Sequence, residues 1–120
     1  MGDIIVASER AFFLQSFCNI GLVPDGGAAY LMSKSIGRVK AMELMLLGER
    51  YPASKAYEDG LVTRLVSDDE LAATTKALAE KLAAGPPTSL KLIRQSAWAA
   101  LDSTFSDQLA RERNLSLIHI

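Results

Sequence analysis

The chain has 120 residues, of which 49% are hydrophobic and 22% charged, and its formal net charge is −1. This length allows one small globular domain at most, and the apolar share with balanced charge excludes a disordered chain. Thirteen basic against fourteen acidic residues leave no positive surplus for nucleic-acid binding. The sequence shows no uncharged apolar run of membrane-spanning length and no secretory signal. Because its single cysteine, Cys18, cannot form an internal disulfide, we expect a cytoplasmic protein.

The first half of the chain combines a short strand with helices. Residues 3–7 form an apolar, β-branched run that predicts a buried strand, and residues 11–17 predict an extended, irregular stretch. After a turn-rich segment over residues 21–27, residues 28–36 predict a helix that a glycine ends. Residues 39–47 are apolar around most of the helical circumference, which predicts a second, buried helix.

The second half is expected to be mainly helical. A proline opens a short helix over residues 52–59, and residues 61–66 predict another short strand. Residues 67–70 match a capping box that begins the next helix. After a Gly-Pro-Pro break, further helices are predicted over residues 89–100 and from about residue 104. Two strands and several helices do not complete a sheet, so the pattern fits the second half of a larger α/β protein.

Three stretches of the sequence carry short motifs, of which residues 3–9 read DIIVASE and residues 20–27 read IGLVPDGG. They resemble the strand CDI-x-x-A-x-E and the loop G-x-x-P-x-x-G-G of the enoyl-CoA hydratase/isomerase (crotonase) superfamily. One departure is Ala28, where relatives of the isomerase branch often have glycine. The third stretch runs from residue 37 to residue 62 and includes LGER and GLV. Each motif is short, but their order and spacing make the resemblance strong.

The resemblance implies an α/β fold, the C-terminal half of the crotonase-like ββα spiral, mostly helical with two short strands. It implies that residues 1–66 end the spiral core and carry a catalytic loop. Residues 67–114 would form a C-terminal helical oligomerisation region, and residues 115–120 would be an unmatched, foreign tail. Family members are about twice this length, so Met1 is expected to be an internal methionine or a truncation point.

The same resemblance implies an acyl-CoA thioester as substrate, with coenzyme A as part of the substrate and no separate cofactor. Family members stabilise an enolate with two backbone N–H groups, which lie upstream of this chain, so the chain alone is expected to be inactive. At full length, a homotrimer or hexamer is implied. No nucleic acid, membrane or metal is expected as a partner.

Asp25 is the candidate catalytic residue. Shifting a double bond moves one proton between two carbons, which a single carboxylate can do, whereas hydration usually engages two. By the resemblance, one hydratase glutamate lies upstream and the second position is Phe17, which cannot transfer a proton. The isomerase branch carries an acid directly after the loop proline, and GLVPD looks most like the epoxide-to-oxepin isomerase of phenylacetate breakdown.

The residues around Asp25 are the candidate substrate-binding residues. They are Phe17, Leu22, Val23, Pro24, Gly26 and Gly27. Three of them, Phe17, Leu22 and Val23, are expected to form an apolar wall beside the carboxylate.

Other interpretations of the chain stay open. An aspartate before Gly-Gly at a helix start is a good N-cap, and a carboxylate bonded to backbone N–H groups is a weaker base. The chain could then descend from an enoyl-CoA hydratase (hydro-lyase) with Asp25 as a cap only, or be a non-catalytic helical fragment. His119 is the single histidine, so no histidine pair for a metal exists, and Cys18 is expected to be a buried small hydrophobe.

Overall fold

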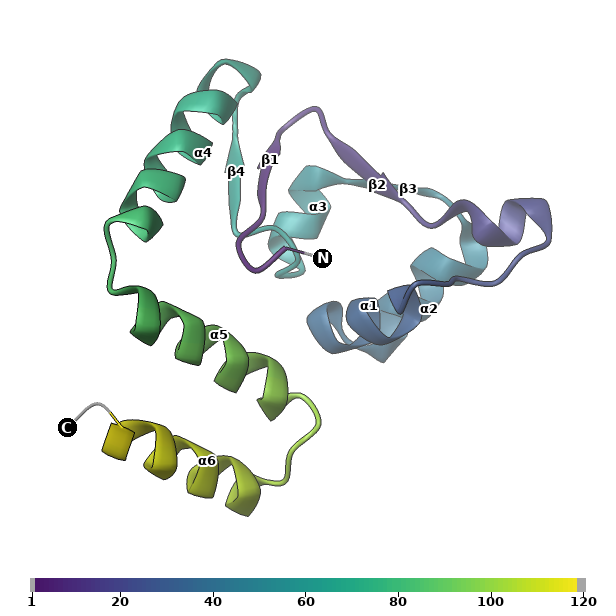
Figure 1. Cartoon of the computed structure of the whole chain (residues 1–120). Helices are drawn as coiled ribbons and strands as arrows, with labels where there is room; N and C mark the ends of the chain where they lie inside the picture. The colour runs from purple at the N-terminus through teal and green to yellow at the C-terminus, as the bar shows by residue number, and fades with distance from the viewer. Residues whose placement is uncertain (1, 119–120) are drawn as a thin grey trace. The chain divides into compact units, whose positions relative to one another are not determined.

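The structure is a computed structural model that describes residues 2–118. The chain forms two compact units, Met1–Lys76 and Ala77–Ile120. Figure 1 shows short strands among helices in the first unit and helices alone in the second. The prediction of a mostly helical α/β chain with short strands is therefore confirmed.

The first unit contains all the strands of the described chain and five of its helical elements. In chain order these are β1 (Val6–Ser8), β2 (Phe12–Leu14), the 3-10 helix η1 (Ser16–Ile20), α1 (Ala28–Ile36), α2 (Arg38–Leu47), β3 (Arg50–Pro52), α3 (Ala53–Glu58), β4 (Arg64–Val66) and the start of α4 (Asp68–Ala83). The second unit contains the end of α4, then α5 (Pro87–Ala100) and α6 (Phe105–Ile118).

The strands form two separate pairs. β1 runs parallel to β4, with Val6 opposite Arg64, and the long crossover between them is what a parallel pair requires. β2 runs antiparallel to β3, with Phe13 opposite Tyr51. Residues 2–118 thus contain four strands, so the prediction of two was wrong. β2 lies in the stretch expected to be extended but irregular, and its pairing with the distant β3 is a long-range contact that no local pattern contains.

Helix α1 has the predicted bounds, whereas the prediction for α2 was only partly correct. Of the residues in α2, only Ala41 and Leu44 are buried, while Val39 is 75% exposed and Leu46 is 65% exposed. Within the described chain, α2 packs chiefly against α1 and η1, so one face of the helix is covered and the rest is not. Because apolar residues surround most of α2, the sequence predicted a helix buried on all sides, but the contacts with α1 and η1 bury only one side of it.

The hydrophobic core of the described chain lies entirely in the first unit. It consists of Ala7, Met32, Ala41, Leu44, Tyr51, Ala53, Ala56, Leu61 and Val62. Several of these are alanines with no exposed surface, which lets the backbones of α2 and α3 approach their neighbours closely. Tyr51 is the largest of the nine, and its ring centroid lies 6.4 Å from that of Phe13.

The junctions around α3 and α4 follow local sequence signals with one difference. Pro52 ends β3 and is the N-cap residue of α3, so the helix begins at Ala53 and not at the proline as predicted. Helix α4 begins directly after Ser67, where the capping box predicted it. The Ser67 hydroxyl lies 3.2 Å from a carboxylate oxygen of Glu70.

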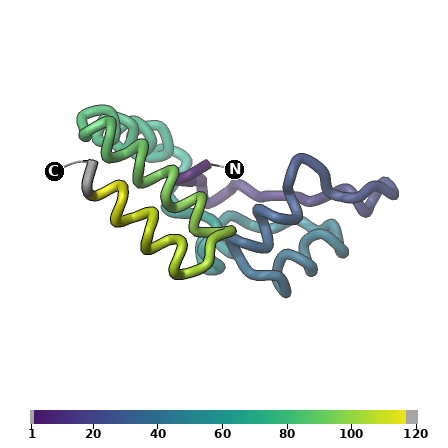
Figure 2. The backbone as a smooth tube through the Cα atoms, turned by 60° about the horizontal axis from the view of Figure 1, so that its bottom comes forward, coloured from purple at the N-terminus to yellow at the C-terminus, as the bar shows by residue number. Residues whose placement is uncertain are grey.

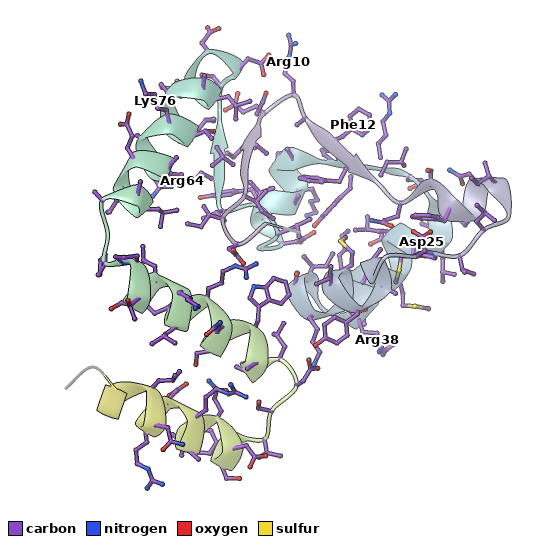
Figure 3. All side chains as sticks on the ribbon, viewed as in Figure 1. Arg10, Phe12, Asp25, Arg38, Arg64 and Lys76 are labelled. Carbon is purple, nitrogen blue, oxygen red and sulfur yellow. The ribbon has the colours of Figure 1, made fainter. Side chains whose placement is uncertain are left out.

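Two side chains join the start of α4 to β1 and the turn that follows. The buried Ser8 hydroxyl donates a hydrogen bond to the Asp68 carboxylate. Arg10, labelled in Figure 3, forms an ion pair of 2.6 Å with the same carboxylate. Asp68 therefore holds the first turn of α4 against the strand within the first unit.

In the second unit, α5 and α6 lie side by side, as the tube in Figure 2 shows. The Gln108 side-chain amide of α6 donates to the Ser96 hydroxyl of α5 at 2.8 Å. Helix α6 extends through Ile118, and His119 lies outside the described residues. No helix within residues 2–118 is both long enough and apolar enough to cross a lipid bilayer.

Candidate functional site

A tight turn connects η1 to the loop that leads into α1. Gly21 adopts a left-handed conformation with φ of 71°, and the Leu22 N–H donates to the Phe17 carbonyl at 2.9 Å. Gly26 and Gly27 also have positive φ values, 58° and 81°, which residues with a side chain rarely adopt. The glycines of the GLVPDGG motif therefore give the loop its path from η1 to α1.

Asp25 lies exposed in this loop, just before α1 (Figure 3). Its backbone carbonyl accepts a hydrogen bond from the Ala28 N–H at 2.9 Å. The N-cap residue of α1 is Gly27, and no side chain caps the helix. The interpretation of Asp25 as the N-cap is therefore wrong, because Gly27 and not Asp25 occupies the N-cap position.

A cavity of about 460 Å³ lies next to the loop within the first unit. Its volume is in the range of small-molecule sites. Its walls are mainly apolar and come from Phe13 of β2, Met32 of α1, Leu44 of α2 and Tyr51 of β3. Gly26 lines the cavity, so the residue next to Asp25 reaches this space.

The other predicted binding residues differ in their exposure to solvent. Phe17 and Pro24 are half-buried, whereas Leu22 is 58% exposed and Val23 is 80% exposed. In the part of the chain that the structure describes, the expected apolar wall beside Asp25 is therefore open. Ligand contact by Phe17, Leu22, Val23, Pro24, Gly26 and Gly27 stays a prediction.

Sequence reasoning missed two polar residues that line the cavity, Gln15 and Glu49. The Oε1 atom of Gln15 is buried and has no hydrogen-bond partner among the described residues. Glu49 follows Gly48, which ends α2 in a left-handed conformation. An acid directly after a helix-ending glycine was the available signal for Glu49, but its position in the cavity depends on long-range packing.

The Tyr51 side of the cavity is held by a partly buried hydrogen bond. The Tyr51 hydroxyl donates to an Asp59 carboxylate oxygen at 2.7 Å. Burial, followed by this hydrogen bond and the negative charge of Asp59, raises the pKa of Tyr51 above its ordinary value. The protonated phenol is the form that donates to Asp59, so this hydrogen bond favours retention of the proton.

The described residues offer little for a metal. Between residues 2 and 118, no three histidine, cysteine, aspartate or glutamate side chains gather as a metal site requires. Cys18 is half-buried at η1, and its Sγ lies 3.5 Å from Oδ1 of Asn19.

Comparison with known proteins places the chain in a family. The family model described as enoyl-CoA hydratase/isomerase matches residues 1–118. The match thus includes residues 115–118, which lie beyond the stretch that the sequence motifs and helix pattern linked to the family. The chain belongs to the enoyl-CoA hydratase/isomerase family.

The matches to individual relatives cover nearly all of this chain. This chain spans less than half the length of each relative described below. The chain is 40% identical over 113 residues to 1,2-epoxyphenylacetyl-CoA isomerase of Escherichia coli, which is 94% of this chain and 43% of that protein. An enoyl-CoA hydratase structure from Polaromonas sp. JS666 is 34% identical with a TM-score of 0.89, covering 96% of this chain and 45% of that one.

A third relative, from Thermobifida fusca YX, was solved in complex with acetoacetyl-CoA. It is 28% identical with a TM-score of 0.92, and the match covers 98% of this chain and 46% of that one. These proteins carry both isomerase and hydratase names, so the family is shown and the reaction is not.

Proposed function

We propose that this chain supplies the proton-transfer residue of an acyl-CoA isomerase, with Asp25 moving a proton between two carbons of an enolised thioester. One observation supports this proposal most directly. Asp25 is not the N-cap residue of α1, and it directly precedes Gly26, which lines the cavity. A carboxylate in this position can take a proton and return it on one face of a substrate. Phe17, at the second hydratase position, offers no such chemistry.

The substrate class follows from the family. An acyl-CoA thioester is the proposed ligand, with coenzyme A as part of the substrate, and the acetoacetyl-CoA complex of the Thermobifida fusca relative supports it. The 40% identity to an epoxyphenylacetyl-CoA isomerase supports isomerisation of a double bond or a ring. In this proposal the chain is the C-terminal half of the enzyme, the enolate-stabilising N–H groups lie upstream, and the assembly is a homotrimer or hexamer.

Hydration is the second candidate function, because one specific observation favours it. Glu49 lines the cavity, so a second carboxylate is available beside the loop of Asp25. Two carboxylates can position a water molecule and move its proton, as addition across a double bond requires. Relatives named as hydratases support this alternative.

The test uses the chain joined to the N-terminal segment that its relatives carry, which we call the joined enzyme. Asp25→Asn keeps the size of the side chain and removes the proton acceptor. We expect kcat for isomerisation of a 3-enoyl-CoA to fall about 100-fold or more. The melting temperature should stay within about 2 °C, because no cap is lost. Asp69→Asn, an exposed aspartate in the first turn of α4, is the matched control.

The products separate the two candidate functions. Isomerisation of a 3-enoyl-CoA yields the 2-enoyl-CoA, whereas hydration adds water and yields a 3-hydroxyacyl-CoA. If Glu49→Gln abolishes water addition and leaves isomerisation intact, the second carboxylate serves a hydratase. An Asp25→Asn variant with full isomerase activity would falsify the proposed role of Asp25.

A further inference from the structure

A single side chain fastens η1 to the end of α2. The Asn19 side-chain N–H donates to the backbone carbonyl of Gly48 at 2.9 Å, across 29 positions of sequence. The contact is partly buried. It joins two segments that approach the cavity from different elements, because η1 leads to the Asp25 loop and Gly48 precedes Glu49.

The side chains at this contact pack closely against Gly48. A Cβ atom there would lie 2.5 Å from the Asn19 Oδ1 atom and 2.7 Å from the Cys18 Sγ atom. Gly48 is buried and has a φ of 59°, a conformation that also favours glycine. A side chain at position 48 would therefore have to displace Asn19 and Cys18, so the contact is a close-fitting clamp.

The Asp25 loop depends on η1 for its first hydrogen bonds. The Gly21 N–H donates to the Cys18 carbonyl at 3.2 Å, and the Leu22 N–H donates to the Phe17 carbonyl. At its other end the loop is joined to α1, where the Ala28 N–H donates to the Asp25 carbonyl, and between the two ends Leu22 and Val23 are mostly exposed. A displacement of η1 is thus transmitted directly to the loop that carries Asp25.

We propose that Asn19 is a positioning residue, which acts through the clamp on Gly48 to fix the Asp25 loop relative to the Glu49 side of the cavity. The inference rests on the proposed function of Asp25. A misplacement of about 1 Å at a reacting group can cost about 100-fold in rate. The η1 end of the loop therefore depends on how η1 is held, and the Asn19 bond to Gly48 is one polar contact that holds it.

The test compares Asn19→Asp with Asn114→Asp in the joined enzyme. Asn19→Asp keeps the shape but removes the donor and turns an oxygen toward the Gly48 carbonyl, whereas Asn114 is exposed on α6. We expect hydrogen exchange of the Gly21 and Leu22 amides, which donate to η1, to rise about 10-fold in Asn19→Asp only. The value of kcat should fall about 10-fold, with KM changed less than about two-fold.

A double variant separates this inference from the proposed function. If Asn19 acts through Asp25, Asn19→Asp should cost no further activity in the Asp25→Asn background. If Asp25→Asn alone keeps full activity, the proposed function fails, and loop exchange still reports on the clamp. Unchanged loop exchange in Asn19→Asp, or an equal rise in the amides of α3, would overturn the positioning role.

Discussion

The two units of the chain differ in what holds them and in what they carry. The first unit, Met1–Lys76, contains all nine buried hydrophobic residues of the described chain, the cavity beside the loop and Asp25. Among the described residues of the second unit, none is buried, and Phe105 is 81% exposed while Ile93 is 64% exposed. The candidate chemistry therefore lies where the chain has a core, and the second unit consists of helices with open apolar faces.

Glycine usage explains much of this difference. Six glycines of the described chain have positive φ values, and all lie in the first unit: Gly21, Gly26, Gly27, Gly37, Gly48 and Gly60. Each permits a sharp change of direction that a residue with a side chain would resist. The second unit contains only Gly85, which does not have a positive φ. Turning the backbone repeatedly builds a compact site, whereas long helices joined by two short connections do not.

The largest expected effect tests whether the core is confined to the first unit. Tyr51→Ala removes a buried ring and its hydrogen bond to Asp59, so the free energy of unfolding should fall by about 3–5 kcal/mol. Phe105→Ala in the second unit should change it by less than about 0.5 kcal/mol. Urea unfolding of the joined enzyme measures both. An equally large loss for Phe105→Ala would mean that another surface covers this ring in solution.

A smaller effect concerns pH and the same tyrosine. Because the pKa of Tyr51 is raised in the folded state, its proton stabilises the fold fully below the ordinary tyrosine pKa of about 10. This contribution is lost as the pH rises above that value, since the unfolded chain then releases the proton more readily. Unfolding at about pH 8 and about pH 11 should show a fall that Tyr51→Phe reduces.

The phenylalanine variant should itself lose about 1 kcal/mol at neutral pH, through the missing hydrogen bond. Tyr57→Phe, which alters a half-exposed tyrosine of the same unit, is the control. The same alkaline fall in wild type and Tyr51→Phe would show that the buried phenol does not link stability to pH.

Local signals predicted part of this structure, and long-range packing decided the rest. The bounds of α1 followed from an apolar run between Gly27 and Gly37, and the start of α4 followed from Ser67 and Glu70, all within a few residues. The pairing of β2 with β3 joins residues about 40 positions apart, which no local pattern contains.

The candidate site divides in the same way. Asp25 is singled out by the resemblance to the family, whose motif around Pro24 and Gly26 is contiguous in the sequence. That its carboxylate does not cap α1, and that Gln15 and Glu49 line one cavity, depends on how separate elements pack. Such contacts are absent from the sequence as a pattern and appear only with the fold.

The smallest expected effect concerns the polar link of the second unit. The Gln108 side-chain N–H donates to the Ser96 hydroxyl at 2.8 Å and to Glu112 at 2.9 Å, while its Oε1 is buried without a partner among the described residues. Gln108→Leu removes these bonds and also removes the unsatisfied oxygen, so the two contributions oppose each other. The free energy of unfolding should therefore change by less than about 1 kcal/mol in either direction, and Gln95→Leu, an exposed glutamine of α5, is the control. Urea unfolding measures this change. A loss above about 2 kcal/mol would mean that a polar network, and not apolar helix packing, holds the second unit together. The two units would then differ in the kind of contact that stabilises them, apolar in the first and polar in the second.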